Sequence, residues 1–298
     1  MMMRPARRRG ARLAGLLSAA VVAVLVGSVA PAYAEQLQLV RTIKTTPFVG
    51  STLVTRDVEG TAYVPRDGSL WISDDNGRAI FEVDPITGAL KRKIGRAAFE
   101  AATQVGGGPV AGTWRTRDFE SMAYDETTDS LYVFSGPCCN ASVLPTAFRL
   151  KRRGNNGTFK VESYQPLAAA ANYTGAGWNG GDGKVYVARG AVLRTYDYAT
   201  NTAGVGFKIP LLSGITGMDF SSNGADLYVS TTAETIRRVD WASKTLVAGW
   251  TFDMKPFDMR DSRAVELING QFYVPDGYDG RPLGDPLRYA VFVFSVVP

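Results

Sequence analysis

Two copies of an Asp-x-Glu pattern are the part of this sequence best suited to chemistry. Asp57 and Glu59 form the first copy, and Asp118 and Glu120 form the second in the same sequence context. If the two glutamates share one site, their charges repel unless a proton, an arginine or a cation compensates them. Glu59 and Glu120 are therefore the candidate metal ligands and also the candidate catalytic residues, acting as acid or base.

Further charged residues are expected around the same place. Oxygen ligands of this kind suit Ca²⁺, Mg²⁺ or Mn²⁺ rather than a soft metal. A structural alternative stays open, because Asp57 and Asp118 can cap turns within their own segments and Glu–Arg networks are common. The expected ligand-binding residues are Arg56, Asp74, Asp75, Arg117, Arg189, Arg263 and Asp276.

The sequence limits the other kinds of site. It contains no histidine, which excludes Ser-His-Asp triads, Cys-His dyads and histidine-ligated zinc. Its two cysteines, Cys138 and Cys139, are adjacent. An exported protein meets an oxidising compartment, so we expect a strained vicinal disulfide, with two free or intermolecular thiols as the alternative.

Residues 1–34 have the order of a secretory signal peptide. Five arginines lie within the first 12 residues, an apolar run follows, and Ala32 and Ala34 supply the small residues of a cleavage site. We therefore expect a secreted protein, with an uncleaved membrane anchor as the alternative. The chain has 33 basic and 28 acidic residues, and without this leader the two numbers are equal. A nucleic-acid partner, which needs a basic excess, is thus excluded, and no membrane contact is expected after cleavage.

The elements that would position the acidic residues come from an internal repeat. One eight-residue segment opens each of five units. In four units the aromatic residue that ends this segment is followed, eight residues later, by an aromatic residue of the next predicted strand. Such regularity is typical of a repeat architecture. The five opening segments are 56–63, 117–124, 171–178, 213–220 and 260–267.

Each unit continues with further predicted strands, the fourth of them near 90–94, 159–163, 205–209 and 246–252. The fifth unit ends after its third strand, so residues 37–43 are expected to supply the missing one. The sequence thus predicts an all-β, five-bladed β-propeller with four-stranded blades over residues 35–298, closed by the N-terminal strand. A six-bladed propeller is the alternative. The longer connections share one end with the starts of the first strands, and a site is expected there.

The first two units resemble a known repeat. The segments 57–63, 70–75 and 80–84, and then 118–120 with 132–133, are similar to the repeat of regucalcin/gluconolactonase and phytase-like secreted propellers. In the lactonase branch, a Glu at the start of one blade and Asn or Asp residues of other blades bind a divalent ion. The resemblance implies that Glu59 or Glu120 is that Glu.

These observations lead to three hypotheses of function. The first is a secreted, monomeric propeller that binds a small-molecule or polymeric ligand at its long-loop face without evident catalysis. The second is a divalent-cation-dependent hydrolase of phosphoesters or lactones. The third is a carboxylate-based glycosidase, which would need two carboxyl groups of unequal pKa about 5–9.5 Å apart. The expected cofactor is Ca²⁺ or another divalent cation.

Overall fold

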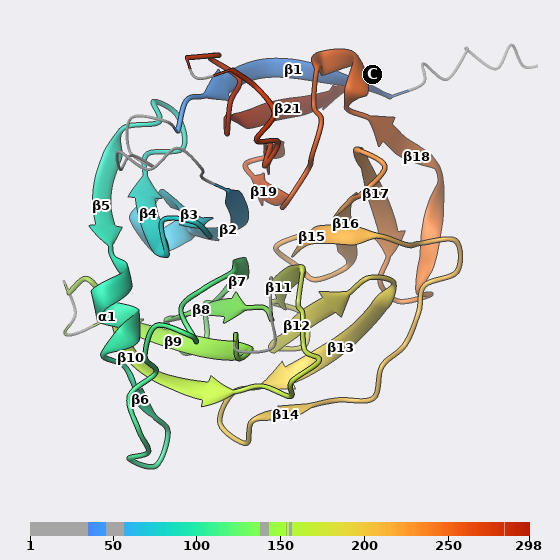
Figure 1. Ribbon diagram of the computed structural model, residues 1–298. Helices are drawn as coiled ribbons and strands as arrows, with labels where there is room; N and C mark the ends of the chain where they lie inside the picture. The colour runs from blue at the N-terminus through green and yellow to red at the C-terminus, as the bar shows by residue number, and fades with distance from the viewer. Residues whose placement is uncertain (1–34, 46–56, 138–142, 153, 155–156, 283) are drawn as a thin grey trace, which may run out of the picture. The chain divides into compact units, whose positions relative to one another are not determined.

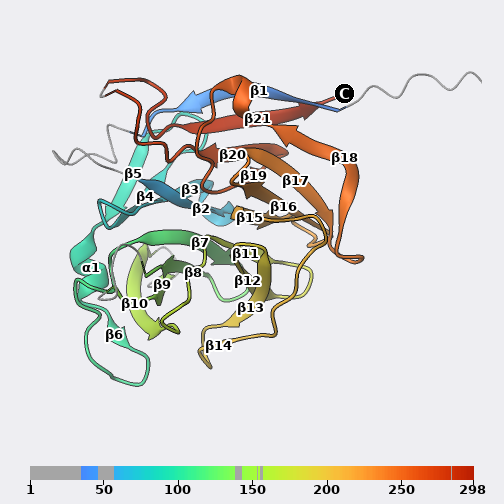
Figure 2. The ribbon, with the colours of Figure 1, turned by 45° about the vertical axis from the view of Figure 1, so that its right-hand side comes forward.

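The computed structural model describes residues 35–45, 57–137, 143–152, 154, 157–282 and 284–298. They form five β-sheets arranged in a ring, which confirms the predicted five-bladed β-propeller. In both views the first strand of each sheet lies toward the middle and the fourth toward the periphery (Figure 1, Figure 2). Among the described residues, no helix is long and apolar enough to span a membrane.

The blades follow the chain in order. Blade 1 contains β2 (Val58–Val64), β3 (Ser69–Asp74), β4 (Ala79–Val83) and β5 (Leu90–Ile94). Blade 2 contains β7 (Phe119–Asp125), β8 (Ser130–Ser135), β9 (Thr146–Arg152), β10 (Phe159–Pro166) and a short fifth strand, β6 (Thr103–Gln104). Blade 3 contains β11 (Gly175–Asn179), β12 (Lys184–Arg189), β13 (Val192–Asp197) and β14 (Thr202–Ala203).

Blade 4 contains β15 (Ile215–Phe220), β16 (Asp226–Thr231), β17 (Thr235–Asp240) and β18 (Thr245–Asp253). Blade 5 contains β19 (Glu266–Ile268), β20 (Gln271–Pro275), β21 (Val291–Val297) and, as its outer strand, β1 (Gln36–Ile43). Three short helices complete the elements of the described residues: η1 (Pro65–Asp67), α1 (Arg96–Glu100) and η2 (Lys255–Phe257).

The two ends of the described chain close the ring. β1 pairs antiparallel with β21, from Gln36 opposite Val297 to Ile43 opposite Val291, and the blue and red strands run side by side in Figure 1. The N-terminal strand thus completes the last blade, as the sequence predicted. Pairing both ends in one sheet covers the edge of β21 that would otherwise be free.

The inner strands converge so closely that one repeat position accepts only small residues. A Cβ on Gly217 would lie 2.2 Å from the Cα of Ala264, and one on Gly60 would lie 2.8 Å from the Cα of Ser121. Real Cβ contacts are longer, so larger side chains would push neighbouring blades apart. The residues at this position are Gly60, Ser121, Gly175, Gly217 and Ala264.

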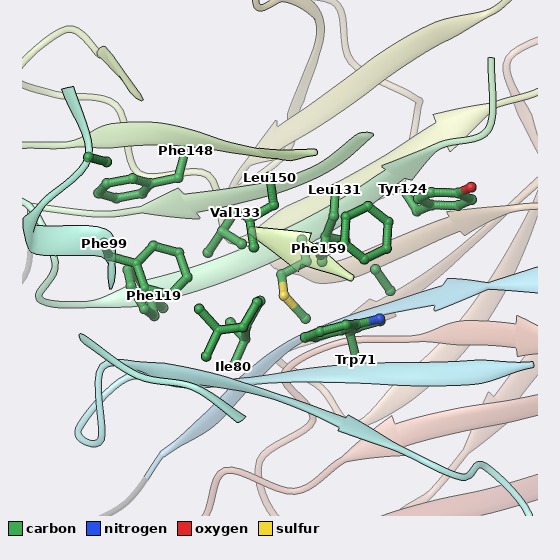
Figure 3. Close-up of a cluster of buried hydrophobic side chains, with 14 of the residues drawn as sticks. Trp71, Ile80, Phe99, Phe119, Tyr124, Leu131, Val133, Phe148, Leu150 and Phe159 are labelled. Carbon is green, nitrogen blue, oxygen red and sulfur yellow. The ribbon is translucent and has the colours of Figure 1, made fainter. Parts of the chain in front are cut away.

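Apolar side chains fill the space between adjacent blades. Figure 3 shows Trp71 and Ile80 of blade 1 facing a set of aromatic and aliphatic residues of blade 2. The ring of Trp71 meets that of Phe159 edge-on at 5.8 Å, and Phe99 of α1 meets Phe148 at 5.2 Å. Because each large buried side chain contributes about 1.5–3 kcal/mol, this face-to-face packing is what holds neighbouring blades together.

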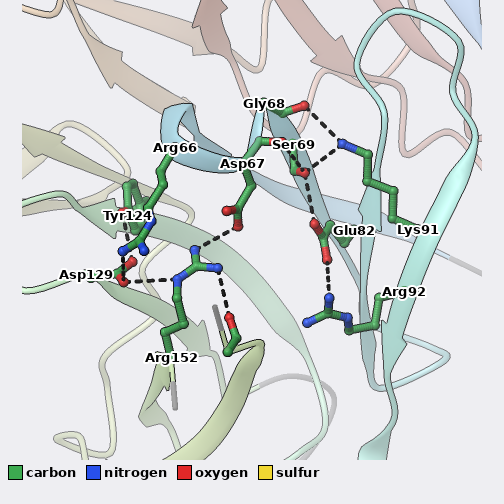
Figure 4. Close-up of polar contacts among 11 residues, drawn as sticks. Arg66, Asp67, Gly68, Ser69, Glu82, Lys91, Arg92, Tyr124, Asp129 and Arg152 are labelled. Atoms are coloured by element: carbon green, nitrogen blue, oxygen red, sulfur yellow. Dashed lines mark hydrogen bonds and ion pairs between the residues drawn. The ribbon is translucent and has the colours of Figure 1, made fainter. Parts of the chain in front are cut away.

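A polar contact joins the same two blades at their short-turn end (Figure 4). Arg152 of β9 donates to Asp67 of η1 at 2.7 Å and to Asp129 in the β7–β8 turn at 3.0 Å. Its guanidinium also lies 4.3 Å from the centre of the Phe159 ring. Only 9% of the Arg152 side chain is exposed, so its positive charge is compensated by these carboxylates rather than by water.

One predicted strand was wrong. The outer strand of blade 3 is limited to Thr202–Ala203, and residues 205–209 contribute only an isolated bridge between Phe207 and Leu193. Gly204, Gly206 and Pro210 flank the exposed Val205. Glycine and proline weaken a continuous strand here, and the outer position gives Val205 no core to pack against.

Candidate functional site

β-Bulges turn the predicted glutamates out of the regular strand pattern. The pairing of β7 with β8 skips one residue between Phe119 and Ser121, and Glu120 is the extra residue. The same shift occurs in β2, where Glu59 and Gly60 together face Ser73 of β3. A bulge re-aims a side chain and is common next to functional sites. Here it occurs at the same repeat position in both blades, at the end of the strands where the long connections lie.

Arg263 precedes β19 and forms ion pairs with the acidic cluster, by which we mean the two Asp-x-Glu patterns and the acidic residues around them. Among the described residues, it is the one cation that pairs with Glu59. Its guanidinium lies 3.1 Å from Glu59, 2.7 Å from Asp261 and 4.0 Å from Asp57. Burial alone would lower the pKa of Arg263, but these carboxylates outweigh it and raise the pKa above its ordinary value. The structure therefore brings together Glu59 and Arg263, two of the residues predicted from the sequence.

Each Asp-x-Glu pattern forms a carboxyl pair. The carboxyl groups of Asp57 and Glu59 interact with each other, and so do those of Asp118 and Glu120. Burial first, and then the neighbouring aspartate, raise the pKa of both glutamates well above the usual range. Each pair can therefore hold a proton at a pH where exposed glutamates are ionised.

Three oxygens converge beside Gly136, the residue that follows β8. A Cβ on Gly136 would lie 2.4 Å from Asn172 Oδ1, 2.6 Å from Asp118 Oδ2 and 2.8 Å from Glu120 Oε1. The Asn172 oxygen is buried and has no hydrogen-bond partner among the described residues. The absence of a side chain at Gly136 thus allows oxygens of blades 2 and 3 to approach this residue closely.

Asp75 ties the two acidic patterns together. Its N–H donates to the carbonyl oxygen of Asp57 at 2.9 Å, and its side chain accepts from the N–H of Phe119 at 3.1 Å. Burial, and then the charges of Asp118 and Asp57, raise the pKa of Asp75 to about 7. Asp75 therefore keeps its proton to a higher pH than an exposed aspartate does.

Asp74 and Asp276 lie at the same end of the blades, but their side chains accept hydrogen bonds from backbone N–H groups. Asp276 Oδ1 accepts from the N–H of Asp261 at 2.9 Å, and its Oδ2 lies 2.9 Å from Arg281. Asp74 Oδ1 accepts from the N–H of Asp57 at 3.4 Å. Both residues are at most 1% exposed, and each fixes the start of the inner strand in its own blade.

The remaining predicted residues are spread around this end. Arg117 is exposed next to Asp118, and its charge lowers the pKa of nearby Arg78, although burial of Arg78 is the larger cause. Arg189 is exposed at the end of β12. Arg56, Cys138 and Cys139 lie outside the described residues, so the proposed disulfide stays a prediction.

The sequence did not single out Asn172, Asp261 or Gly136 as site residues. Asn172 and Asp261 occupy the same repeat position as Asp57 and Asp118, and this was the available signal. Over the described parts of the chain, no group of three His, Cys, Asp or Glu residues is arranged to hold a metal ion. At Gly136 the third oxygen comes from an amide, so the donor set there is mixed.

Comparisons with known proteins agree with this fold. Residues 19–162 match the family model Phytase-like, described as esterase-like activity of phytase. No protein of curated function matches the sequence. Glutaminyl cyclase from Myxococcus xanthus superposes with a TM-score of 0.57 at 12% identity, covering 89% of this chain and 98% of that one.

A gluconolactonase from Xanthomonas campestris superposes with a TM-score of 0.49 at 10% identity, covering 82% of this chain and 87% of that one. At these identities, the structural likeness to the cyclase shows the fold alone. The sequence match adds the family resemblance that the repeat had indicated. The chain is a five-bladed β-propeller that resembles the phytase-like family over residues 19–162.

Proposed function

We propose that this propeller is a divalent-cation-dependent hydrolase and that phosphoesters are its substrates. The observation that carries the proposal is the convergence of Asp118, Glu120 and Asn172 oxygens beside Gly136. The substrate class follows from the description of the matched family, esterase-like activity of phytase. The same end of the propeller is the ligand-binding face expected from the long loops.

The donor set fits a hard cation. All three donors are oxygens, two from carboxylates and one from an amide, which is the chemistry that Ca²⁺ prefers. The buried Asn172 oxygen has no partner among the described residues, and a buried acceptor without a partner is costly. Asp118, Glu120 and Asn172 would therefore hold Ca²⁺, and when bound the ion would polarise a phosphoryl oxygen and activate water.

The surrounding side chains supply the other requirements of hydrolysis. Glu59 is oriented by Arg263 at 3.1 Å, and burial raises its pKa above that of an exposed glutamate, which suits a group that accepts and returns a proton. Arg117 and Arg78 lie near each other at the rim. We propose that they bind the phosphate oxygens of the substrate, as guanidinium groups commonly do.

Export completes the proposal. Residues 1–34 lie outside the described residues, and the assignment as a secretory leader rests on their sequence. We propose that the propeller is released as a secreted monomer. Outside the cell, Ca²⁺ would be available to the proposed cation site.

Thermal unfolding and substrate screening test the function. We expect EDTA to lower the Tm of residues 35–298 and Ca²⁺ to restore it, because a ligand at a hundred times its Kd stabilises by about 2.7 kcal/mol. Phosphoesters, lactones and glycosides are then screened with each metal. A Tm indifferent to EDTA, Ca²⁺, Mg²⁺ and Mn²⁺, with no turnover, would reject the hydrolase in favour of a binding protein. Turnover of glycosides in EDTA would favour the glycosidase.

Gly136→Ala tests the cation site without changing its charge. The new methyl group would enter the space between the three oxygens, so we expect the Ca²⁺-dependent rise in Tm and the turnover to be lost. Gly95→Ala is the matched control, because its Cβ would meet only Lys93 Cε at 4.0 Å. Equal Ca²⁺ responses in the two variants would contradict the assignment.

A further inference from the structure

A cavity lies at the other end of the inner strands from the acidic cluster. Its volume is about 420 Å³, and its lining comes from the C-terminal ends of the five inner strands and the short turns after them. The acidic cluster lies at the N-terminal ends of these strands, so the two sites are at opposite ends of β2, β7, β11, β15 and β19. A cavity of this size is typical of small-molecule sites.

Aromatic residues are part of the lining of this cavity. The last residue of each repeated segment belongs to the lining, and four of the five are aromatic. Aromatic ring faces attract cations, most strongly when several surround one space. The five residues are Tyr63, Tyr124, Trp178, Phe220 and Leu267.

Two carboxyl groups, one buried and one partly buried, occupy the preceding repeat position. In three blades this position is small, with Ala62, Ala123 and Gly177, but in blades 4 and 5 it is Asp219 and Glu266. A small side chain would serve packing equally well in all five blades. The two acids therefore add ionisable carboxyl groups to an otherwise regular lining.

Glu266 has an oxygen available for a ligand. The residue is only 8% exposed, and its Oε1 accepts from the N–H of Tyr63 at 2.6 Å. No hydrogen bond to its other oxygen is present among the described residues, and that oxygen is not fully buried, so it can be reached from the cavity. A largely buried carboxylate is stabilised when a positive group approaches it.

The lining carries no positive charge of its own. Asp219 is held by the N–H groups of Phe220 and Leu267, both at 2.8 Å, and Glu126 adds a third acidic side chain. None of the described residues that line the cavity is Lys or Arg. When these acids ionise, no cationic side chain of the described lining compensates their charge.

We propose that this cavity binds an organic ammonium cation, with Glu266 and Asp219 as counter-charges and the aromatic rings around its alkyl groups. The proposal is independent of the cation-dependent hydrolase at the other end. The proposed hydrolysis uses no residue of this cavity. Either proposal can therefore be rejected by experiment without affecting the other.

Choline and its neutral carbon analogue, 3,3-dimethylbutan-1-ol, test the proposal. They share shape and hydroxyl group but differ in charge. Using calorimetry on residues 35–298 in EDTA, we expect choline to bind at least tenfold more tightly than the alcohol. Equal affinities, or no binding of either compound, would overturn the proposal.

Glu266→Gln separates charge from folding. The glutamine oxygen can still accept from Tyr63, so the variant should fold, yet choline affinity should fall at least tenfold. Glu234→Gln is the matched control, because Glu234 is also 8% exposed but lies at the other end of the blades, in the β16–β17 turn. Choline binding that survives Glu266→Gln, or is lost equally in the control, would contradict the proposal.

Trp178 provides a second, independent comparison. Trp178→Phe keeps an aromatic face, whereas Trp178→Leu keeps only apolar volume. We expect choline affinity to be largely retained in the first and to fall severalfold in the second. Equal affinities in the two variants would show that the rings do not bind the cation. Gly136→Ala should leave choline binding unchanged, which distinguishes this site from the proposed Ca²⁺ site.

Discussion

The carboxyl groups of Asp219 and Glu266 make the stability of the fold depend on pH. Burial is the main cause that raises the pKa of Asp219 to about 7, and burial and then the Asp219 charge raise that of Glu266. Glu126 is the other acid that faces Asp219, while the backbone N–H groups of Phe220 and Leu267 act in the opposite direction. The folded state therefore holds protons that the unfolded chain releases near pH 4.

This sets the sign of the pH dependence. Since the folded state binds more protons, the free energy of unfolding should fall as pH rises from about 4 to 7. Glu266→Gln removes one of the two groups, so its free energy of unfolding should match that of the wild type near pH 4 and exceed it increasingly as the pH rises. Urea unfolding at several pH values measures this. Glu162→Gln, at an exposed position of β10, is the control, and a parallel shift at every pH would contradict the prediction.

At the scale of elements, Arg152 joins blades 1 and 2 through two carboxylates. Arg152→Met keeps the apolar stem but leaves Asp67 and Asp129 without their shared partner. We expect a loss of about 2–3 kcal/mol in the free energy of unfolding. Arg149→Met is a control on the same strand, because its partner Glu162 is 42% exposed and such pairs contribute about 1 kcal/mol or less. Equal losses in the two variants would contradict a special role for Arg152.

The sequence predicted elements well where the repeat was regular. The spacing of aromatic residues identified the inner strands, and the missing strand of the fifth unit identified β1 as its completion. The predicted strand at 205–209 was wrong, because Val205 has no core to pack against. The bulges could not be foreseen either, because a single extra residue at Glu120 leaves no mark in a pattern that alternates polar and apolar positions.

The candidate site was predictable in part for the same reason. Aligning the repeats brought Glu59 and Arg263 to one position, and the structure places them 3.1 Å apart. Asn172 belonged to the equivalent position two residues earlier, but its role depends on Gly136, a residue of a different blade and strand. Contacts of this kind depend on the packing of neighbouring blades. The spacing of residues within one repeat gives no information about that packing.

At the scale of the whole molecule, closure by β1 should decide whether the ring is stable. β1 pairs along the whole of β21, and Ile43, which is 3% exposed, packs into the core shared by blades 1 and 5. Leu37 and Leu39 cover the core between blades 4 and 5. Removing residues 35–43 would uncover these apolar groups and leave the edge of β21 free to pair with other molecules.

Two truncations measure this contribution. A chain that begins at residue 35 keeps β1, so it should unfold cooperatively in urea and remain monomeric in size-exclusion chromatography. A chain that begins at residue 44 should lose the cooperative transition or aggregate, because the last blade cannot be completed by any other described strand. A synthetic peptide of residues 35–43 added in trans should restore the transition in a concentration-dependent way, since it supplies the same hydrogen bonds and apolar contacts. Full stability of the shorter chain without the peptide would mean that blades 1 and 5 hold the ring closed by their facing sheets alone.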